Sequence, residues 1–130
     1  MKSLKLIFAL LLPFTISACG SFEEVNLGYP KTVEFSKDGG ELTVHSKAYL
    51  TNAEIQNYEK GEDGETTVLE DGTRRCTYKW LSVEYQPNTA ELKIIAEPNN
   101  TQSRKLHIEL YSGYQYHTIE VLQEAHHLIE

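Results

Sequence analysis

Apolar and polar residues alternate with a period of two along most of the chain after residue 31, which predicts half-buried β-strands and not helices. The clearest strands are expected at 32–35, 41–45, 81–85 and 92–96, with Leu42 and Val44 facing inward in the second. The glycines of Lys37-Asp38-Gly39-Gly40 predict either a hairpin or a corner at which the chain changes sheets. We therefore expect an immunoglobulin-like antiparallel β-sandwich of about seven strands.

The middle of the chain, from Ala48 to Lys79, alternates less clearly. Two glycine-containing stretches, residues 61–64 and 71–72, interrupt it and predict one or two hairpins that partly protrude. Cys76 and Tyr78 alternate onto one face with Trp80, but the inward set then shifts by one to begin at Leu81. This slip predicts a β-bulge or a strand edge at Trp80-Leu81.

The last predicted element is a hairpin closed by a two-residue loop at Ser112-Gly113, which would pair Tyr111 with Tyr114 and Glu109 with Tyr116. Its outward face then carries a cluster of aromatic and polar residues: Tyr111, Tyr114, Tyr116, His107 and Glu109. Sugars present apolar faces with a polar edge, so this cluster is a candidate platform for a glycan. The alternative is that the rings pack on a neighbouring strand or shield the backbone.

The N-terminus predicts export and lipid attachment. Two lysines precede an apolar run at 6–14 that is too short to span a bilayer. Ile16-Ser17-Ala18-Cys19 resembles the lipobox of bacterial lipoproteins, which implies cleavage before Cys19, a thioether through its thiol, and several lipid chains on this cysteine, enough for firm anchoring. An ordinary secretory leader is the alternative. We expect a signal peptide at 1–18, a lipidated tether at 19–30, the sandwich at 31–125 and a tail at 126–130.

The net charge limits which molecules the chain can bind, and the cysteine content limits its disulfide bonds. The net charge of −7 becomes −9 once Lys2 and Lys5 leave with the leader. Such a chain repels nucleic acid and anionic membrane surfaces, so we expect no nucleic-acid partner. With Cys19 carrying lipid, Cys76 has no partner for an intramolecular disulfide, and we expect it to be a small buried residue.

No motif indicates catalysis. The acidic loop at 59–65 does not match the ligand spacing of a calcium loop, and His126-His127 lacks further ligands nearby. The chain has neither a nucleophile beside a base nor a phosphate-binding loop that we recognise. We therefore expect a protein that is not an enzyme and that uses no cofactor and no metal. Trp80 is expected in the core, with sugar stacking as the alternative.

Four features, in this order, resemble the BACON domain, an immunoglobulin-like module frequent in exported Bacteroidetes proteins. They are Phe35 with Gly39-Gly40 and the strand at 41–46, then Trp80-Leu81-Ser82-Val83, then Asn99 or Asn100 followed by Arg104, and finally Val121-Leu122-Gln123. The match covers residues 32–124. Three departures are the absence of an earlier tryptophan, where Tyr49 or Leu50 stands, a longer segment at 56–77, and Pro87-Asn88-Thr89 in place of a common turn glycine.

Two functions from different classes follow. The resemblance implies an association with carbohydrate, so the chain is expected to be a non-catalytic binding module for glycan or mucin in the bacterial cell envelope. Ser21 is not the aspartate that retains lipoproteins at the inner membrane in some bacteria, so the resemblance favours the outer membrane, and Glu23-Glu24 points to the cell surface. The alternative is a structural spacer or a protein-docking subunit of an envelope complex.

Overall fold

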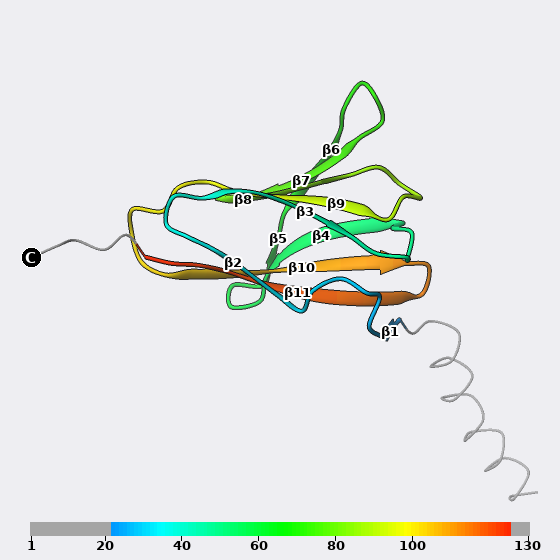
Figure 1. Cartoon of the computed structure of the whole chain (residues 1–130), viewed down its shortest axis with the longest axis horizontal. Coiled ribbons are helices and arrows are strands. Elements are labelled where there is room, and N and C mark those ends of the chain that lie inside the picture. The colour runs from blue at the N-terminus through cyan, green and yellow to red at the C-terminus, as the bar shows by residue number, and fades with distance from the viewer. Residues whose placement is uncertain (1–21, 126–130) are drawn as a thin grey trace, which may run out of the picture.

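The computed structural model describes residues 22–125, and this part of the chain consists of eleven strands without a helix (Figure 1). The expected sandwich is confirmed: the strands form two sheets that lie one above the other. In the first sheet the order is β1-β11-β10-β4-β5, and β2 also pairs with β11. Its strands are β1 (Glu23–Glu24), β2 (Thr32–Phe35), β4 (Asn52–Asn57), β5 (Glu62–Asp63), β10 (Arg104–Ser112) and β11 (Gln115–Gln123).

The second sheet has the order β3-β9-β8-β7-β6 and is antiparallel throughout. Its strands are β3 (Gly40–His45), β6 (Glu65–Val68), β7 (Arg74–Tyr78), β8 (Leu81–Tyr85) and β9 (Glu91–Ala96). The described strands outnumber the expected seven because short strands were not visible as alternation in the sequence. The first sheet is mixed and not purely antiparallel as expected, because β1 and β2 both pair with β11 in parallel.

The glycine turn after β2 is a corner between the sheets and not a hairpin. β2 pairs with β11 of the first sheet, whereas β3 pairs with β9 of the second. Gly39 has a φ of 76° at this corner, a backbone conformation that side chains with a Cβ rarely adopt. Leu42 was expected to face inward, but it is exposed, because β3 forms an edge of its sheet and covers little of the core.

The segment between β4 and β8 also passes from one sheet to the other. β5 folds back on β4, and the chain then crosses at Gly64 to the β6–β7 hairpin, which protrudes from the sandwich (Figure 1). A Cβ on Gly64 would lie 2.8 Å from the Sγ of Cys76, so the crossing requires glycine. The slip in alternation at Trp80 is the two-residue turn of the β7–β8 hairpin and not a bulge.

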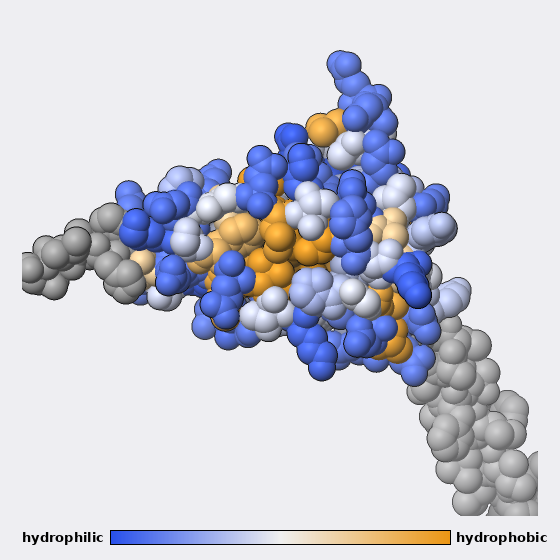
Figure 2. All heavy atoms as spheres, viewed as in Figure 1, coloured by the Kyte–Doolittle hydropathy of each residue, from blue (hydrophilic) through white to orange (hydrophobic). Residues whose placement is uncertain are grey.

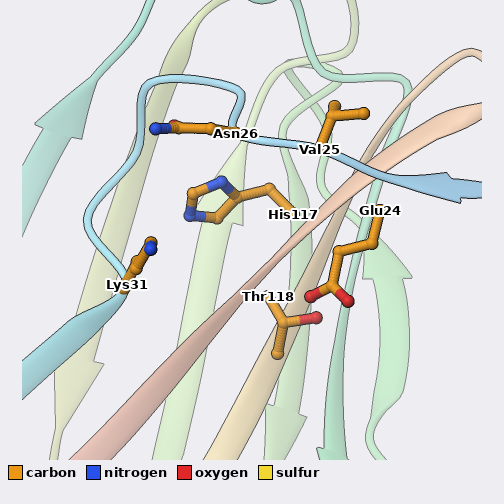
Figure 3. A pocket seen from close by; sticks show the side chains of 6 residues that line it. All are labelled: Glu24, Val25, Asn26, Lys31, His117 and Thr118. Atoms are coloured by element: carbon orange, nitrogen blue, oxygen red, sulfur yellow. The ribbon is translucent and has the colours of Figure 1, made fainter.

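The described part of the expected tether, residues 22–30, packs on the sandwich and does not hang free. Leu27 and Tyr29 belong to the hydrophobic core. The backbone N–H of Leu27 donates to Nδ1 of His117, and Nε2 of the same ring lies 3.0 Å from the carbonyl oxygen of Pro30. Figure 3 shows this ring enclosed by the N-terminal segment. The expected tether is therefore wrong for residues 22–30, because a buried histidine on β11 holds this segment on the sandwich.

One hydrophobic core fills the space between the sheets. Figure 2 shows apolar side chains along the seam between the two layers, with hydrophilic residues on the outer surfaces. Cys76 and Trp80 are both buried in this core, as expected, and Cys76 is a free thiol. The described residues include no helix long and apolar enough to cross a membrane. Cys19 and His126-His127 lie outside the described residues, as do the expected signal peptide and tail.

Candidate functional site

The β10–β11 hairpin has a register that differs from the expected one by two residues. Ser112 pairs with Gln115, so the loop is Gly113-Tyr114 and not Ser112-Gly113. Gly113 has a φ of 64° at the first loop position, which is where type II′ turns place glycine. A shift of two residues leaves every side chain on its expected face, because side chains alternate with a period of two.

This register separates Tyr114 from the other four residues of the expected glycan platform. Tyr111 pairs directly with Tyr116, and their ring centroids are 5.8 Å apart on the solvent-facing side of the first sheet. Both rings are half-buried. His107 and Glu109 lie on the same side of β10. Tyr114 instead occupies the hairpin loop, where 73% of it is exposed, and it is not part of the sheet face.

Tyr58, which the sequence analysis did not single out, completes the sheet face. Its ring stacks on that of His107 with centroids 4.3 Å apart, and its hydroxyl donates to Glu109. Because one face of the ring lies on the histidine and 52% of Tyr58 is exposed, the other face is open to solvent. Tyr58 follows the outward positions of β4 in the same two-residue rhythm, and this was the signal that could have identified it.

Glu109 is the hydrogen-bonding centre of this face. Its two carboxylate oxygens accept hydrogen bonds from different phenols, Tyr58 on one oxygen and Tyr111 on the other, the latter at 2.8 Å. Directly opposite on β4 lies Glu54, which accepts from the amides of Asn52 and Gln56. Like charges at paired positions destabilise a sheet. The hydrogen bonds to Glu54 and Glu109 come from neutral amides and phenols and not from cationic side chains. We call the five residues Tyr58, His107, Glu109, Tyr111 and Tyr116 the aromatic face.

The environment shifts the acid–base behaviour of these residues. Burial and the hydrogen bond to Glu109 raise the pKa of Tyr58 and that of Tyr111 well above the ordinary value. Burial lowers the pKa of His107, and Lys105 lowers it further, against the opposing effect of Glu120 and Glu109. At neutral pH the ring is therefore uncharged, which suits stacking against a phenol.

We expect Glu109→Gln to lower the pH at which two tyrosines ionise, because a neutral amide removes the negative charge that opposes tyrosinate formation. A tyrosine with a raised pKa contributes stability that is complete below its unfolded pKa of about 10 and is lost as the pH rises through the folded value. Near-ultraviolet absorbance during an alkaline titration measures this. Identical titration curves for the wild type and the variant would contradict the hydrogen bonds from Tyr58 and Tyr111 to Glu109.

Hollows also lie elsewhere on the described part of the molecule. One, of about 400 Å³, borders His117 and includes Glu24, Lys31 and Thr118 (Figure 3). Another, of about 480 Å³, is lined by Trp80 and Arg104 among others. The Arg104 guanidinium lies over the Trp80 ring and donates to Gln123 and to two backbone carbonyls, so its role is structural. Within residues 22–125 no group of three acidic, histidine or cysteine side chains could hold a metal ion.

Comparison with known proteins supports the fold. The structure is similar to one solved by NMR, described as a protein from Bacteroides thetaiotaomicron, with a TM-score of 0.58 and 19% sequence identity over 85% of this chain and 94% of that chain. No protein-family model and no curated protein matches the sequence. The fold and the site thus define a small β-sandwich with an aromatic and acidic sheet face, and the resemblance to the BACON domain stays a prediction.

Proposed function

We propose that the protein is a non-catalytic, lipid-anchored module of the bacterial cell envelope, at the outer membrane or cell surface, that binds a glycan on its aromatic face. The observation that carries this proposal is the exposed ring of Tyr58 beside a carboxylate that is already oriented by two phenols. The resemblance of the sequence to the BACON domain agrees with it.

The chemistry of the aromatic face suits a sugar. The apolar CH face of a pyranose can stack on the open side of Tyr58, while its hydroxyls reach the surrounding acceptors. A carboxylate has about four acceptor sites, and the phenols use two of those on Glu109, so two remain for sugar hydroxyls. His107 fixes the plane of the Tyr58 ring, which lowers the entropy cost of binding.

We expect Tyr58→Ala and Glu109→Gln each to weaken glycan binding by about tenfold, or about 1.4 kcal/mol. Isothermal titration of the full-length protein in detergent against a panel of neutral and acidic oligosaccharides measures this. Tyr49→Ala is the matched control, since Tyr49 is an exposed tyrosine outside the aromatic face. Failure of every oligosaccharide to bind, or equal binding by all three variants and the wild type, would refute the proposal.

The β6–β7 hairpin favours a second candidate function, docking of a protein in an envelope complex. β6 is an edge strand of the second sheet, all four of its residues are exposed, and Val68 presents an apolar side chain to solvent. Exposed edges of this kind can pair with a strand of another protein. Crosslinking from a probe at Val68 in intact cells tests this candidate, and recovery of no envelope protein would count against it.

A further inference from the structure

Three exposed aromatic side chains gather at one end of the sandwich. Tyr114 is at the tip of the β10–β11 hairpin, and the ring of Phe22, 54% exposed, lies 6.1 Å from it. Tyr49, 64% exposed, lies in the connection between β3 and β4. Thr51 of that connection donates its N–H to Tyr111 and accepts from Gly113, which holds the connection beside the hairpin. We call Phe22, Tyr49 and Tyr114 the aromatic tip.

The aromatic tip is close to the expected lipid attachment in covalent terms. Cys19 precedes Phe22 by three residues, and three extended residues span at most about 11 Å. From Glu23 onward there is no slack, because Glu23 donates its backbone N–H to Tyr114 and Val25 donates to Tyr116, at 2.9 and 2.8 Å. Lipid chains on Cys19 would therefore keep this end of the sandwich within about 11 Å of the bilayer.

The chemistry of the aromatic tip matches the surface of a bilayer. The headgroup layer on each side is roughly 5–8 Å thick, given about 30 Å of hydrocarbon in a membrane of about 40–45 Å. Tyrosine is enriched in this layer, because its ring contacts apolar chains while its hydroxyl stays hydrated. The headgroup layer of the bilayer is therefore a suitable partner for the exposed rings of the aromatic tip, and no second protein is needed to cover them.

We propose that the aromatic tip inserts into the headgroup layer of the membrane that carries the lipid anchor, so that the sandwich stands upright on the bilayer. This inference rests on the lipid anchoring that is part of the proposed function. Glu23 and Glu24 are exposed next to the tip, so the favoured surface has zwitterionic and not anionic headgroups.

An upright orientation fixes where the other surfaces lie. β10 runs from Arg104 to Ser112 along the long axis of the sandwich (Figure 1). Nine strand residues span about 30 Å, so the connection that precedes β10 would be about that far from the headgroups. The aromatic face then stands perpendicular to the bilayer and is open from the side. A ligand can reach it without displacing the domain from the membrane.

Fluorescence quenching by lipids tests this orientation. The full-length lipidated protein is placed in phosphatidylcholine vesicles that contain a lipid with a nitroxide near the headgroup. Tyr114→Trp puts an indole on the aromatic tip, and the emission added by this substitution is expected to fall to about half. Gln102→Trp is the matched control at the opposite end, where Gln102 is exposed, and its added emission should not change. Wild-type protein gives the baseline from buried Trp80.

The outcomes separate this inference from the proposed function. Mass spectrometry first establishes whether Cys19 carries lipid. An unmodified Cys19 overturns the anchoring and this inference together. A lipidated protein in which the Tyr114→Trp indole is not quenched overturns only the contact of the tip with the bilayer. Equal quenching at both positions overturns the upright orientation. Quenching at the tip alone, weakened by a further Phe22→Ser substitution, is the expected result.

Discussion

Gly39→Ala is expected to lower the free energy of unfolding by roughly 3 to 5 kcal/mol, a large part of the stability of a small domain. Two independent costs add. The φ of 76° strains any residue that has a Cβ. The added Cβ would also overlap the carbonyl oxygen of Ala96 and lie 2.8 Å from the carbonyl carbon of Glu97. These are backbone atoms at the end of β9, and they cannot move without disturbing the second sheet.

Chemical denaturation followed by circular dichroism measures the effect. Gly72→Ala is the matched control, because Gly72 has a φ of 90° in a turn but a Cβ there would meet no atom within 4 Å. It should cost only the backbone strain, about 1 to 2 kcal/mol. Equal losses for the two variants would show that contact with Ala96 and Glu97 does not constrain the corner between the sheets.

Asn99→Ala is expected to destabilise the protein by about 3 kcal/mol, because it leaves several buried polar groups without partners. Asn99 is 2% exposed. Its side-chain nitrogen donates to the carbonyl oxygens of Gln102 and Glu124, both at 2.8 Å. Its oxygen accepts from the backbone N–H and the hydroxyl of Thr101, at 3.0 and 2.8 Å. One side chain thus joins the connection before β10 to the end of β11.

Asn100→Ala is the control for Asn99→Ala, since Asn100 is an exposed asparagine at the next position. Its effect should stay within about 0.5 kcal/mol. Thermal unfolding of both variants at one protein concentration gives the comparison. If both variants unfold at the wild-type temperature, the hydrogen bonds of Asn99 contribute nothing net to stability.

Part of the candidate site was predictable from local pattern. Alternation placed His107, Glu109, Tyr111 and Tyr116 on one outward face, and the structure keeps them there. The turn position was wrong, because both Ser112-Gly113 and Gly113-Tyr114 offer a glycine to a two-residue loop. Only the pairing of the whole strands decides between them. That choice moved Tyr114 from the sheet face to the aromatic tip.

Alternation along β4 could have placed Tyr58 on the outward side of that strand, but the sequence alone could not place its ring beside His107. Tyr58 is separated from His107 by 49 positions, and the stacking of the two rings depends on β4 pairing with β10. Pairing between strands that are distant in sequence is set by the packing of the complete core, which local alternation does not report. The same limit applies to the N-terminal segment, where the contact that matters is with His117 on the last strand.

The sequence by itself determined that the described chain forms strands and which side of each well-patterned strand is apolar, because a period of two depends only on backbone geometry. It also determined that a corner or hairpin must follow Phe35, since glycines supply the conformation that the turn needs. Tertiary structure alone decided which strands are neighbours, which loop closes the last hairpin, and that residues 22–30 join the sandwich. These outcomes depend on long-range burial and on hydrogen bonds from single buried side chains, whose partners lie far away along the chain.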